Sequence, residues 1–414
     1  MEVRPGYKQT EVGAIPEGWA VKLLGDLFEV TSSKRVFQSE WRTNGVPFYR
    51  ARELAVLGET GFVDNELFIT REMYEEFKGR HGVPATGDML VTGVGTLGKT
   101  YVVSGEHEFY FKDGNIIWFK IGLSLSSEFL RQLYLTPLII KQIGSGSAGT
   151  TVGTYTITAA KKTTIPFPPL PEQRAIATAL SDVDALLGGL DRLIAKKRDL
   201  KQAAMQQLLT GQTRIPGFHS EWEAVEFGDI ATIRNTKVVA SATPSGTQCV
   251  ELESIGQGSG RLLMSTDATG SASKYSFKKG DVLFGRLRAY LRKYWLATFD
   301  GICSTEIWPL IARDERLCGD FLHLLVQAND FVNAAGVSYG THMPRSDWSV
   351  LEKFPVRLPP FPEQTAIAAV LSDMDAELSA LEVRRGKTRD LKQGMMQELL
   401  TGKTLLVPAG AAHA

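Results

Sequence analysis

The sequence predicts a mixed α/β (α+β) fold with a pseudo-twofold internal repeat, in which two globules are separated by an antiparallel pair of long coiled-coil helices. Three observations lead to this prediction. Residues 168–213 return as residues 359–404 without a gap, and 28 of the 46 aligned positions are identical. Both copies carry the four-and-three spacing of a heptad seam. The regions outside the copies contain short β-branched and aromatic runs broken by glycine and aspartate, which is typical of twisted sheets.

The two globules, expected at about 1–166 and 214–357, are weakly related to each other. Each opens with Ile-Pro and then Trp, and each has a Gly-Asp pair before a β-like run and an Ile-Trp pair further on. The matched anchors are Ile15-Pro16 and Ile215-Pro216, Gly87-Asp88 and Gly280-Asp281, and Ile117-Trp118 and Ile307-Trp308. Between the anchors the sequences diverge, which indicates a shared scaffold with two different reading surfaces.

Residues 93–100 of the first globule match the P-loop pattern letter for letter, with Lys99 and Thr100 at the end. A P-loop needs a strand before it and a helix after it, because loop amides and the helix N-terminus cradle the phosphate. Residues 101–105 are β-branched and end in glycine, which does not suit a helix. We therefore expect a glycine hairpin with Lys99 at its tip, and a P-loop nucleotide hydrolase using Lys99 and Thr100 stays as an alternative.

The first repeated copy is expected to form a helix from Glu172 to Thr210, about 58 Å long at about 1.5 Å per residue. A Pro-rich stretch precedes each copy and suits a helix start, and Gly211 and Gly402 are placed as C-terminal caps. Gly188-Gly189 weakens the middle of the first helix, where we expect a kink or a close backbone contact. The seam residues are Ile176, Leu180, Val183, Leu187, Leu190 and Ile194 in the first copy, and Ile367, Leu371, Met374, Leu378 and Leu381 in the second, before Arg385 interrupts the pattern.

The counterpart of the glycine hairpin in the second globule, residues 285–293, is basic and interleaved with tyrosine. Period-two spacing would place Arg286 and Arg288 on one face of a strand. Arginine binds phosphate oxygens and guanine edges through its planar fork, although a solvated charged strand would also fit. Arg50 and Arg52 form a similar, weaker pair in a β-like run of the first globule.

A Gly-, Ser- and Thr-rich segment precedes each helical copy, at 144–151 and 337–342. Its amides and hydroxyls would suit phosphate or base edges, and a flexible linker is the alternative. Together with the hairpins, these segments supply the residues expected to contact DNA. They are Arg50, Arg52, Lys99, Thr150, Thr151, Arg286, Arg288, Tyr290, Arg292, Lys293, Thr341 and His342.

The identity between the copies extends to solvent-type residues that a self-packed seam does not need, which indicates a second surface that binds a partner. Two surface helices that merely share ancestry are the alternative. The expected partner-binding residues are Glu172, Gln173, Asp182, Lys201, Gln202, Gln206, Glu363, Gln364, Asp373, Lys392, Gln393 and Gln397. Residues 405–414, after the second copy, are small and apolar and are expected to be disordered.

Composition is that of an ordinary globular protein: 414 residues, 43% hydrophobic and 22% charged. Residues 1–10 lack the apolar region of a signal peptide, and no apolar run reaches the roughly 18–20 residues of a membrane span. Three cysteines without Cys-x-x-Cys spacing indicate neither a disulfide framework nor zinc, so we expect a cytoplasmic protein. We find no triad order and no metal-ligand cluster, and therefore expect no catalytic or metal-binding residues.

Net charge limits the role that nucleic acid can have. Lys and Arg number 46, Asp and Glu number 46, and the formal charge is zero. A protein that holds nucleic acid alone is usually basic. Three explanations stay open: nucleic acid is not the ligand, the positive charge is local, or a partner supplies the rest.

The duplicated Pro-Pro-Leu-Pro-Glu-Gln segment, its heptads and its Leu-Leu-Thr-Gly end resemble the conserved regions of the specificity subunit of type I restriction-modification systems. The resemblance covers essentially the whole chain. It implies target-recognition domains at 1–166 and 214–357 and conserved helical spacers at 167–213 and 358–404. It implies a non-catalytic protein in which each globule reads one half of a split double-stranded DNA site and the helices set the gap.

The same resemblance implies partners. Two modification (methyltransferase) subunits, which carry S-adenosylmethionine, would dock on the helices, and restriction subunits that use ATP and magnesium would join them. The chain itself would bind no cofactor and no membrane. An assembly scaffold that bridges two copies of a partner without reading DNA is a further alternative.

Overall fold

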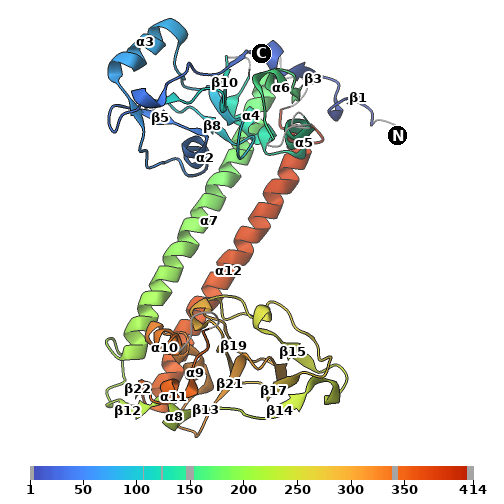
Figure 1. The fold of residues 1–414 in the computed structure, drawn as a ribbon. Coiled ribbons are helices and arrows are strands. Elements are labelled where there is room, and N and C mark those ends of the chain that lie inside the picture. Colours follow the sequence, from blue (N-terminus) through green and yellow to red (C-terminus); the bar gives the residue numbers. More distant parts are fainter. Residues whose placement is uncertain (1–3, 106, 123–124, 146–152, 338–343, 408–414) are drawn as a thin grey trace. The chain divides into compact units, whose positions relative to one another are not determined.

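The computed structural model describes residues 4–105, 107–122, 125–145, 153–337 and 344–407. The chain folds into two compact units: unit 1 comprises residues 1–190 and 384–414, and unit 2 comprises residues 191–383. Each unit holds one globule together with one end of each long helix, α7 (Leu170–Thr210) and α12 (Phe361–Leu399) (Figure 1). Within the described part of the chain, no helix is long and apolar enough to cross a membrane.

The globule of unit 1 centres on a four-stranded antiparallel sheet in the order β4-β10-β7-β8. A second sheet has the order β6-β5-β9, and β3 pairs with β11, so the beginning and the end of the globule meet. The elements are β1 (Tyr7–Thr10), β2 (Gly13–Pro16), β3 (Ala20–Leu23), α1 (Leu24–Leu27), β4 (Glu29–Thr31), β5 (Val46–Tyr49), α2 (Ala51–Thr60), β6 (Phe68–Ile69), α3 (Arg71–His81), β7 (Met89–Thr92), β8 (Thr100–Val102), β9 (Tyr110–Phe111), β10 (Ile116–Lys120), α4 (Ser127–Tyr134), α5 (Pro137–Ser145), α6 (Ile157–Lys161) and β11 (Thr164–Phe167).

Alternation along β7 builds a core on each face of this sheet, because successive side chains of a strand point to opposite sides. Met89 and Val91 belong to one core, which α4, α5 and both long helices complete. Leu90 belongs to the other core, together with Leu54 of α2 and Trp118 of β10. The sheet is therefore covered on both faces. The loops that join its strands can then carry side chains that differ between the two globules.

Unit 2 repeats this architecture. Its antiparallel sheet β13-β21-β18-β19 has the order of the equivalent strands in unit 1, and its second sheet has five strands, β14-β17-β20-β15-β16. The predicted mixed fold with an internal repeat is confirmed. The elements are β12 (Glu223–Glu226), α8 (Phe227–Ile230), β13 (Ala231–Ile233), β14 (Lys237–Val239), β15 (Gln248–Val250), β16 (Thr266–Asp267), β17 (Ser273–Phe277), β18 (Val282–Gly285), β19 (Tyr294–Leu296), β20 (Gly301–Cys303), β21 (Ile307–Ala312), α9 (Gly319–Leu325), α10 (Asn329–Ala335), α11 (Trp348–Leu351) and β22 (Pro355–Leu358).

The long helices pair antiparallel within each unit. In unit 1 the start of α7 shares a core with the end of α12, through Ile176, Leu180 and Leu399. In unit 2 the end of α7 shares a core with the start of α12, through Leu209 and Ile367. Both helices are therefore part of the core of each globule that they join.

The C-terminal ends of both long helices and the middle of α7 can be compared with the sequence-based predictions. Gly211 and Gly402 have left-handed φ angles of 72° and 70°, which confirms both predicted caps. Helix α7 continues without a break through Gly188-Gly189. The close backbone contact expected there is wrong for Gly189, because an added Cβ would meet no atom within 4 Å.

An ion pair at equivalent repeat positions joins the two long helices in each unit. Lys392 Nζ lies 2.6 Å from Asp184 Oδ1 in unit 1, and Lys201 Nζ lies 2.6 Å from Asp375 Oδ1 in unit 2. Only 12% and 14% of the two lysine side chains are exposed. Each ammonium is turned toward the neighbouring helix of its own chain, so these ion pairs give no support to the prediction that both lysines contact a partner.

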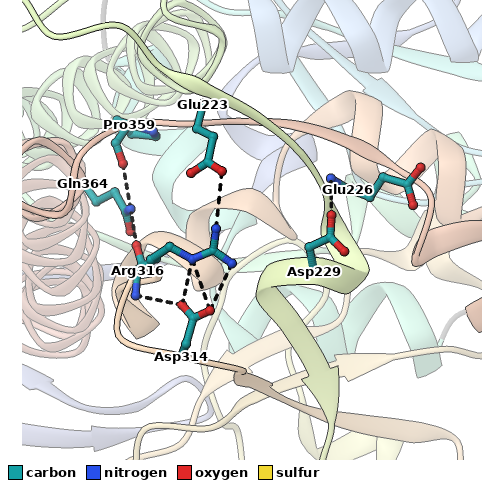
Figure 2. A network of polar contacts seen from close by, with 7 residues as sticks. All are labelled: Glu223, Glu226, Asp229, Asp314, Arg316, Pro359 and Gln364. Carbon is teal, nitrogen blue, oxygen red and sulfur yellow. Dashed lines mark hydrogen bonds and ion pairs between the residues drawn. The ribbon is translucent and has the colours of Figure 1, made fainter.

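The repeated Gln173 and Gln364 are buried clamps. The side-chain oxygen of Gln173 accepts the Ser126 N–H at 2.8 Å, and its amide donates to Pro168 O at 2.8 Å. Gln364 accepts the Cys318 N–H at 2.8 Å. It donates to the carbonyls of Arg316 and Pro359 at 2.7 and 2.8 Å (Figure 2). Each amide thus ties the first turn of a long helix to the first turn of α4 or α9. Since both are 0% exposed, the predicted partner contact is wrong for both.

The neighbouring Glu172 and Glu363 are buried as well, with exposures of 4% and 0%. Glu363 accepts two hydrogen bonds from the Arg214 guanidinium, at 2.6 and 2.7 Å, and one from Trp222 Nε1 at 3.0 Å. Glu172 accepts the backbone N–H groups of residues 406 and 407 at 2.9 and 2.7 Å. A partner contact is again the wrong prediction, because both carboxylates hold segments of their own unit. Residues 408–414 of the expected disordered tail lie outside the described residues.

Candidate nucleic-acid interface

The loops after β7 and β18 lie at equivalent places in the two sheets. Residues 93–99 join β7 to its antiparallel neighbour β8, so the P-loop-like segment is a β-hairpin with no helix after it. The Gly98 and Lys99 N–H groups donate to Thr92 at 2.9 and 3.0 Å, so these two amides are not available to a phosphate. The predicted glycine hairpin is confirmed, and the hairpin gives the P-loop alternative no support.

Lys99 does not lie at the tip of this hairpin, contrary to the prediction. Its carbonyl accepts the Thr92 N–H at 2.9 Å, which places it at the base of the loop. Its ammonium lies 2.5 Å from Glu59 of α2. The loop of unit 1 therefore exposes backbone and small side chains, and its lysine already has a carboxylate partner.

Each hairpin loop is bridged to the residues that follow the Gly-rich segment of its unit. Val94 pairs with Thr154 in unit 1, and Leu287 pairs with Arg345 in unit 2. The Arg288 N–H also donates to Pro344 O at 2.8 Å. Two elements that are distant in sequence therefore meet at one edge of each globule. The candidate residues Thr150, Thr151, Thr341 and His342 themselves lie outside the described residues.

The basic loop of unit 2 is not a strand. Strand β18 ends at Gly285, so the prediction that Arg286 and Arg288 share one face of a strand is wrong. Arg288 and Arg292 have φ angles of 55° and 50°, the only positive values for non-glycine residues in the described part of the chain. Such conformations cost on the order of 1–3 kcal/mol each and gather at functional sites. The strain marks this loop as a candidate contact surface.

The basic side chains of the loop fall into two groups. Arg292 donates to Gln327 O at 3.2 Å and to Asn329 Oδ1 at 2.5 Å. Lys293 donates to the carbonyls of Leu252 and Ile255 at 2.8 and 3.0 Å. Because these contacts support the loop from inside, Arg292 and Lys293 have structural roles.

The remaining side chains of the loop are available. Arg288 is exposed and Tyr290 is 59% exposed, and neither side chain has a partner among the described residues. In the same loop, the Arg286 guanidinium lies 4.8 Å from the ring centre of Trp308, and its buried Nε has no acceptor among the described residues. An exposed guanidinium and phenol in the same loop as a second arginine can contact phosphates and base edges.

Arg50 and Arg52 lie at the start of a helix, because β5 ends at Tyr49 and α2 begins at Ala51. The predicted β-like run is therefore wrong. Arg50 donates to Glu53 from its backbone at 3.1 Å and from its guanidinium at 3.0 and 2.5 Å. Arg52 is exposed, and it is the member of the pair that remains free to contact a ligand.

Other candidate partner residues do lie on the surface. Asp182 and Asp373, Gln202 and Gln393, and Gln206 and Gln397 are all exposed.

Sequence reasoning missed Leu200 and Leu391, which are identical between the copies and are 48% and 59% exposed. Identity at a position outside the seam was the signal that could have found them. We call the following set the repeated surface: Lys196, Asp199, Leu200 and Gln206 on α7, and Lys387, Asp390, Leu391 and Gln397 on α12. At about 3.6 residues per turn, the members on each helix share one side.

A family-model comparison matches the chain twice. The family is described as type I restriction modification DNA specificity domain, and the matches cover residues 16–195 and 219–387. The two matches reproduce the two-unit repeat of the fold.

Two relatives are described as type I restriction enzyme specificity subunits. The type I restriction enzyme MjaVIII specificity subunit of Methanocaldococcus jannaschii is 22% identical over 426 residues, which is 96% of this chain and 95% of that protein. The type I restriction enzyme EcoDI specificity subunit of Escherichia coli is 26% identical over 217 residues, which is 50% of this chain and 46% of that protein.

Among solved structures, the S subunit of a type I restriction-modification system from M. genitalium has a TM-score of 0.58 at 14% identity. The comparison covers 97% of this chain and 98% of that chain. A likeness of this kind establishes the fold, and it agrees with the two sheets and the long helices described above.

Proposed function

We propose that this chain, which belongs to the type I restriction-modification DNA specificity family, reads a split DNA target with one half-site for each globule. The DNA-specificity role follows from the two family matches and the full-length relatives. The observation that carries the finer proposal is the pair of equivalent loops. The sheets below them keep one strand order, whereas the loops themselves differ in charge and shape. Two different loops on one scaffold suit two different half-sites.

In unit 2 we assign the main contact to Arg288 and Tyr290, with Arg286 in the same loop. A free guanidinium can bind guanine through two hydrogen bonds or hold a phosphate, and each such base contact contributes about 1–3 kcal/mol of discrimination. The bridge of this loop to Arg345 brings the residues that follow the Gly-rich segment into the same contact region. In unit 1 the glycine hairpin, the residues around Thr154 and the exposed Arg52 are the corresponding candidates.

The repeated surface supports a proposal about partners. A half-exposed leucine flanked by Lys, Asp and Gln occurs once on each long helix, in the same sequence frame. Two identical surfaces suit two copies of one partner, for which we propose the modification (methyltransferase) subunits. Those subunits would hold S-adenosylmethionine, restriction subunits would use ATP and magnesium, and the chain itself would be non-catalytic. Such an assembly on chromosomal DNA would work in the cytoplasm.

The helices also support a proposal about the gap between half-sites. Because α7 and α12 are continuous and belong to the cores of both units, their length would fix the gap. B-DNA turns about once per 34–36 Å, so helix length would translate into base pairs. Deleting seven residues from each helix, within 191–197 and 382–388, is expected to change the gap that is recognised. An unchanged gap would exclude the helices as its determinant.

The central experiment is a footprint of the complex of this chain with its partner subunits on a library of random DNA. We expect a protected split motif, and methylated adenine within the same motif when S-adenosylmethionine is supplied. Arg288→Ala should relax one half of the motif and leave the other half intact. If no split sequence is protected, the chain is an assembly scaffold. If both halves weaken equally, Arg288 is a general phosphate contact.

A further inference from the structure

A polar hollow of about 760 Å³ lies in unit 2 between α7, α12 and the globule. Its walls include Arg198 and Lys201 of α7, Asp375 and Glu382 of α12, and Arg261 of the glycine-rich segment 257–261. Pockets for small molecules have volumes of about 300–1,000 Å³. The hollow therefore has room for a ligand of nucleotide size, and the candidate DNA contacts Arg286, Arg288 and Tyr290 are not part of its lining.

A single substitution between the repeats explains how the hollow can exist. In unit 1, Arg131 of α4 donates to Glu128 and reaches Asp184 at 3.5 Å. The equivalent residue of α9 is His323, and the equivalent of Asp184 is Asp375. The shorter imidazole lies against Tyr294, with ring centres 5.9 Å apart. The space beside Asp375 that an arginine would fill is left open.

The charges that face the hollow favour an anion. Lys201 lies 2.6 Å from Asp375, and Glu382 lies 2.6 Å from Arg198 and 2.9 Å from Arg261. With Arg292, which also lines the hollow, four cations face two carboxylates. Burial lowers the pKa of His323 to about 4, so the imidazole adds no charge near neutral pH. The lining keeps two positive charges that its own carboxylates do not balance.

Several donors in the lining are unused. Tyr294 lines the hollow, and its hydroxyl donates no hydrogen bond to a described residue. The backbone N–H groups of Ser259 and Gly260 likewise have no acceptor in the described part of the chain. Gly258 and Gly260 have left-handed φ angles of 62° and 64°. Turns of this kind gather successive N–H groups around a bound anion.

We propose that this hollow binds a phosphate-bearing anion of nucleotide size, with Arg198, Arg261 and the Tyr294 hydroxyl as donors. Each of the two arginines gives only one nitrogen to Glu382, which leaves the rest of its fork for the ligand. The Ser259 and Gly260 amides complete the set. A free nucleotide and a backbone phosphate of DNA share this chemistry, and experiment can separate them.

The test uses the full chain and calorimetric titration with ADP, pyrophosphate and adenosine. ADP and pyrophosphate should bind at one site per chain, and adenosine, which lacks phosphate, should not. Arg261→Gln should weaken ADP binding at least about tenfold, because it removes a charge-assisted hydrogen bond. Tyr294→Phe removes only the hydroxyl and should weaken binding about fivefold, with an unchanged melting temperature.

Arg71→Gln is the matched control. Arg71 is 55% exposed and paired with Glu108 of unit 1, much as Arg261 is 48% exposed and paired with Glu382. This variant should bind ADP normally. Absence of binding by both ADP and pyrophosphate overturns the proposal, and so does an equal loss in Arg71→Gln and Arg261→Gln, since that would reflect general charge.

A competition experiment identifies the source of the phosphate. If a target duplex displaces ADP, the hollow takes a phosphate of the DNA backbone, and if both bind together it takes a free phosphorylated molecule. Either result supports phosphate chemistry. This proposal can fail separately from the proposed reading of half-sites. ADP binding is measured by titration, and half-site reading is measured by the footprint of the Arg288→Ala complex.

Discussion

The loops after β7 and β18 occupy equivalent places in two similar sheets, yet they differ in chemistry. In unit 1, Gly93 leaves no room for a side chain, because a Cβ there would lie 2.6 Å from Tyr155 O. The equivalent position in unit 2 holds Arg286, which stacks on Trp308. Away from the loops, Gln173 and Gln364 each accept a hydrogen bond from a backbone N–H at the start of a short helix and donate one to a proline carbonyl. The comparison separates a scaffold that both units must keep from a reading surface that each unit can change.

The largest effect is expected at the clamp. Gln364→Ala leaves the Cys318 N–H and two carbonyls without partners in a buried site, and should lower the stability of unit 2 by about 3 kcal/mol. Hydrogen exchange during urea unfolding, read separately for peptides of each unit, measures the change. Gln173→Ala should have the corresponding effect in unit 1, and the exposed Gln397→Ala should have almost none. If Gln364→Ala were as mild as Gln397→Ala, the clamp would not hold the scaffold.

The second prediction concerns His323, which stands in unit 2 where unit 1 has Arg131. The folded pKa of His323 is about 4, below the ordinary value of about 6.5, because burial and then the Lys201 charge disfavour the imidazolium. Protonation therefore favours unfolding. The contribution is fully present above pH 6.5 and is lost as the pH falls toward 4, on the order of 2–3 kcal/mol.

Unit 2 should therefore lose stability between pH 6.5 and 4 relative to a His323→Gln variant, whose side chain does not titrate. Urea unfolding of both proteins at several pH values, followed by tryptophan fluorescence, provides the measurement. Parallel curves for the two proteins would contradict the assignment of the pH dependence to His323.

The third prediction compares the two loops directly. Arg288→Ala should weaken binding of the complex by about thirtyfold to duplexes that contain the half-site read by unit 2, because the Arg288 guanidinium is free to contact DNA. Lys99→Ala should have a smaller effect, since its ammonium is already paired with Glu59. Titration of duplexes with one half-site scrambled at a time separates the two. Equal losses on both duplexes would remove the assignment of this loop to one half-site.

Much of this scaffold was predictable because its signals are local. The heptad spacing, Gly211 and Gly402 as caps, and the β-branched residues after Lys99 each predict a structure from a few neighbouring residues. Arg50 was misplaced although a local signal existed: Glu53, three residues on, accepts the Arg50 N–H and marks a helix start.

The clamp and the basic loop were misread because their determinants are distant in sequence. A glutamine next to a proline-rich stretch looks like a surface residue, and its partners Ser126 and Cys318 are about 46–47 residues away. Strand β18 ends at Gly285, and two residues later Leu287 pairs with Arg345, a contact that no alternation in the sequence encodes. The sequence alone therefore does not distinguish the loop proposed to read DNA from the residues that support it; the structure does.

The fourth prediction tests whether the repeated surface binds one partner twice. Leu200→Lys and Leu391→Lys should each weaken binding of one partner subunit about tenfold, because a half-exposed leucine would be buried on docking. Both variants should melt like the parent chain. Native mass spectrometry of the complex counts the partner subunits, and Leu263→Lys, at a 65% exposed leucine outside the repeated surface, is the control. A complex with two partners in the double variant would rule this surface out.

The smallest effect is expected in the middle of α7, where the repeats also differ. Gly189 aligns with Ala380 of α12, and a Cβ at Gly189 would meet no atom within 4 Å. Gly189→Ala should therefore stabilise the helix by about 0.5–1 kcal/mol, because glycine loses more backbone entropy on folding, and Ala380→Gly should destabilise α12 by a similar amount. Hydrogen exchange of peptides that span each position measures both. If Gly189→Ala also narrows the range of gap lengths that the complex accepts, the glycine pair is a point of flexibility that the copy in α12 has lost. If that range is unchanged, helix length alone sets the gap.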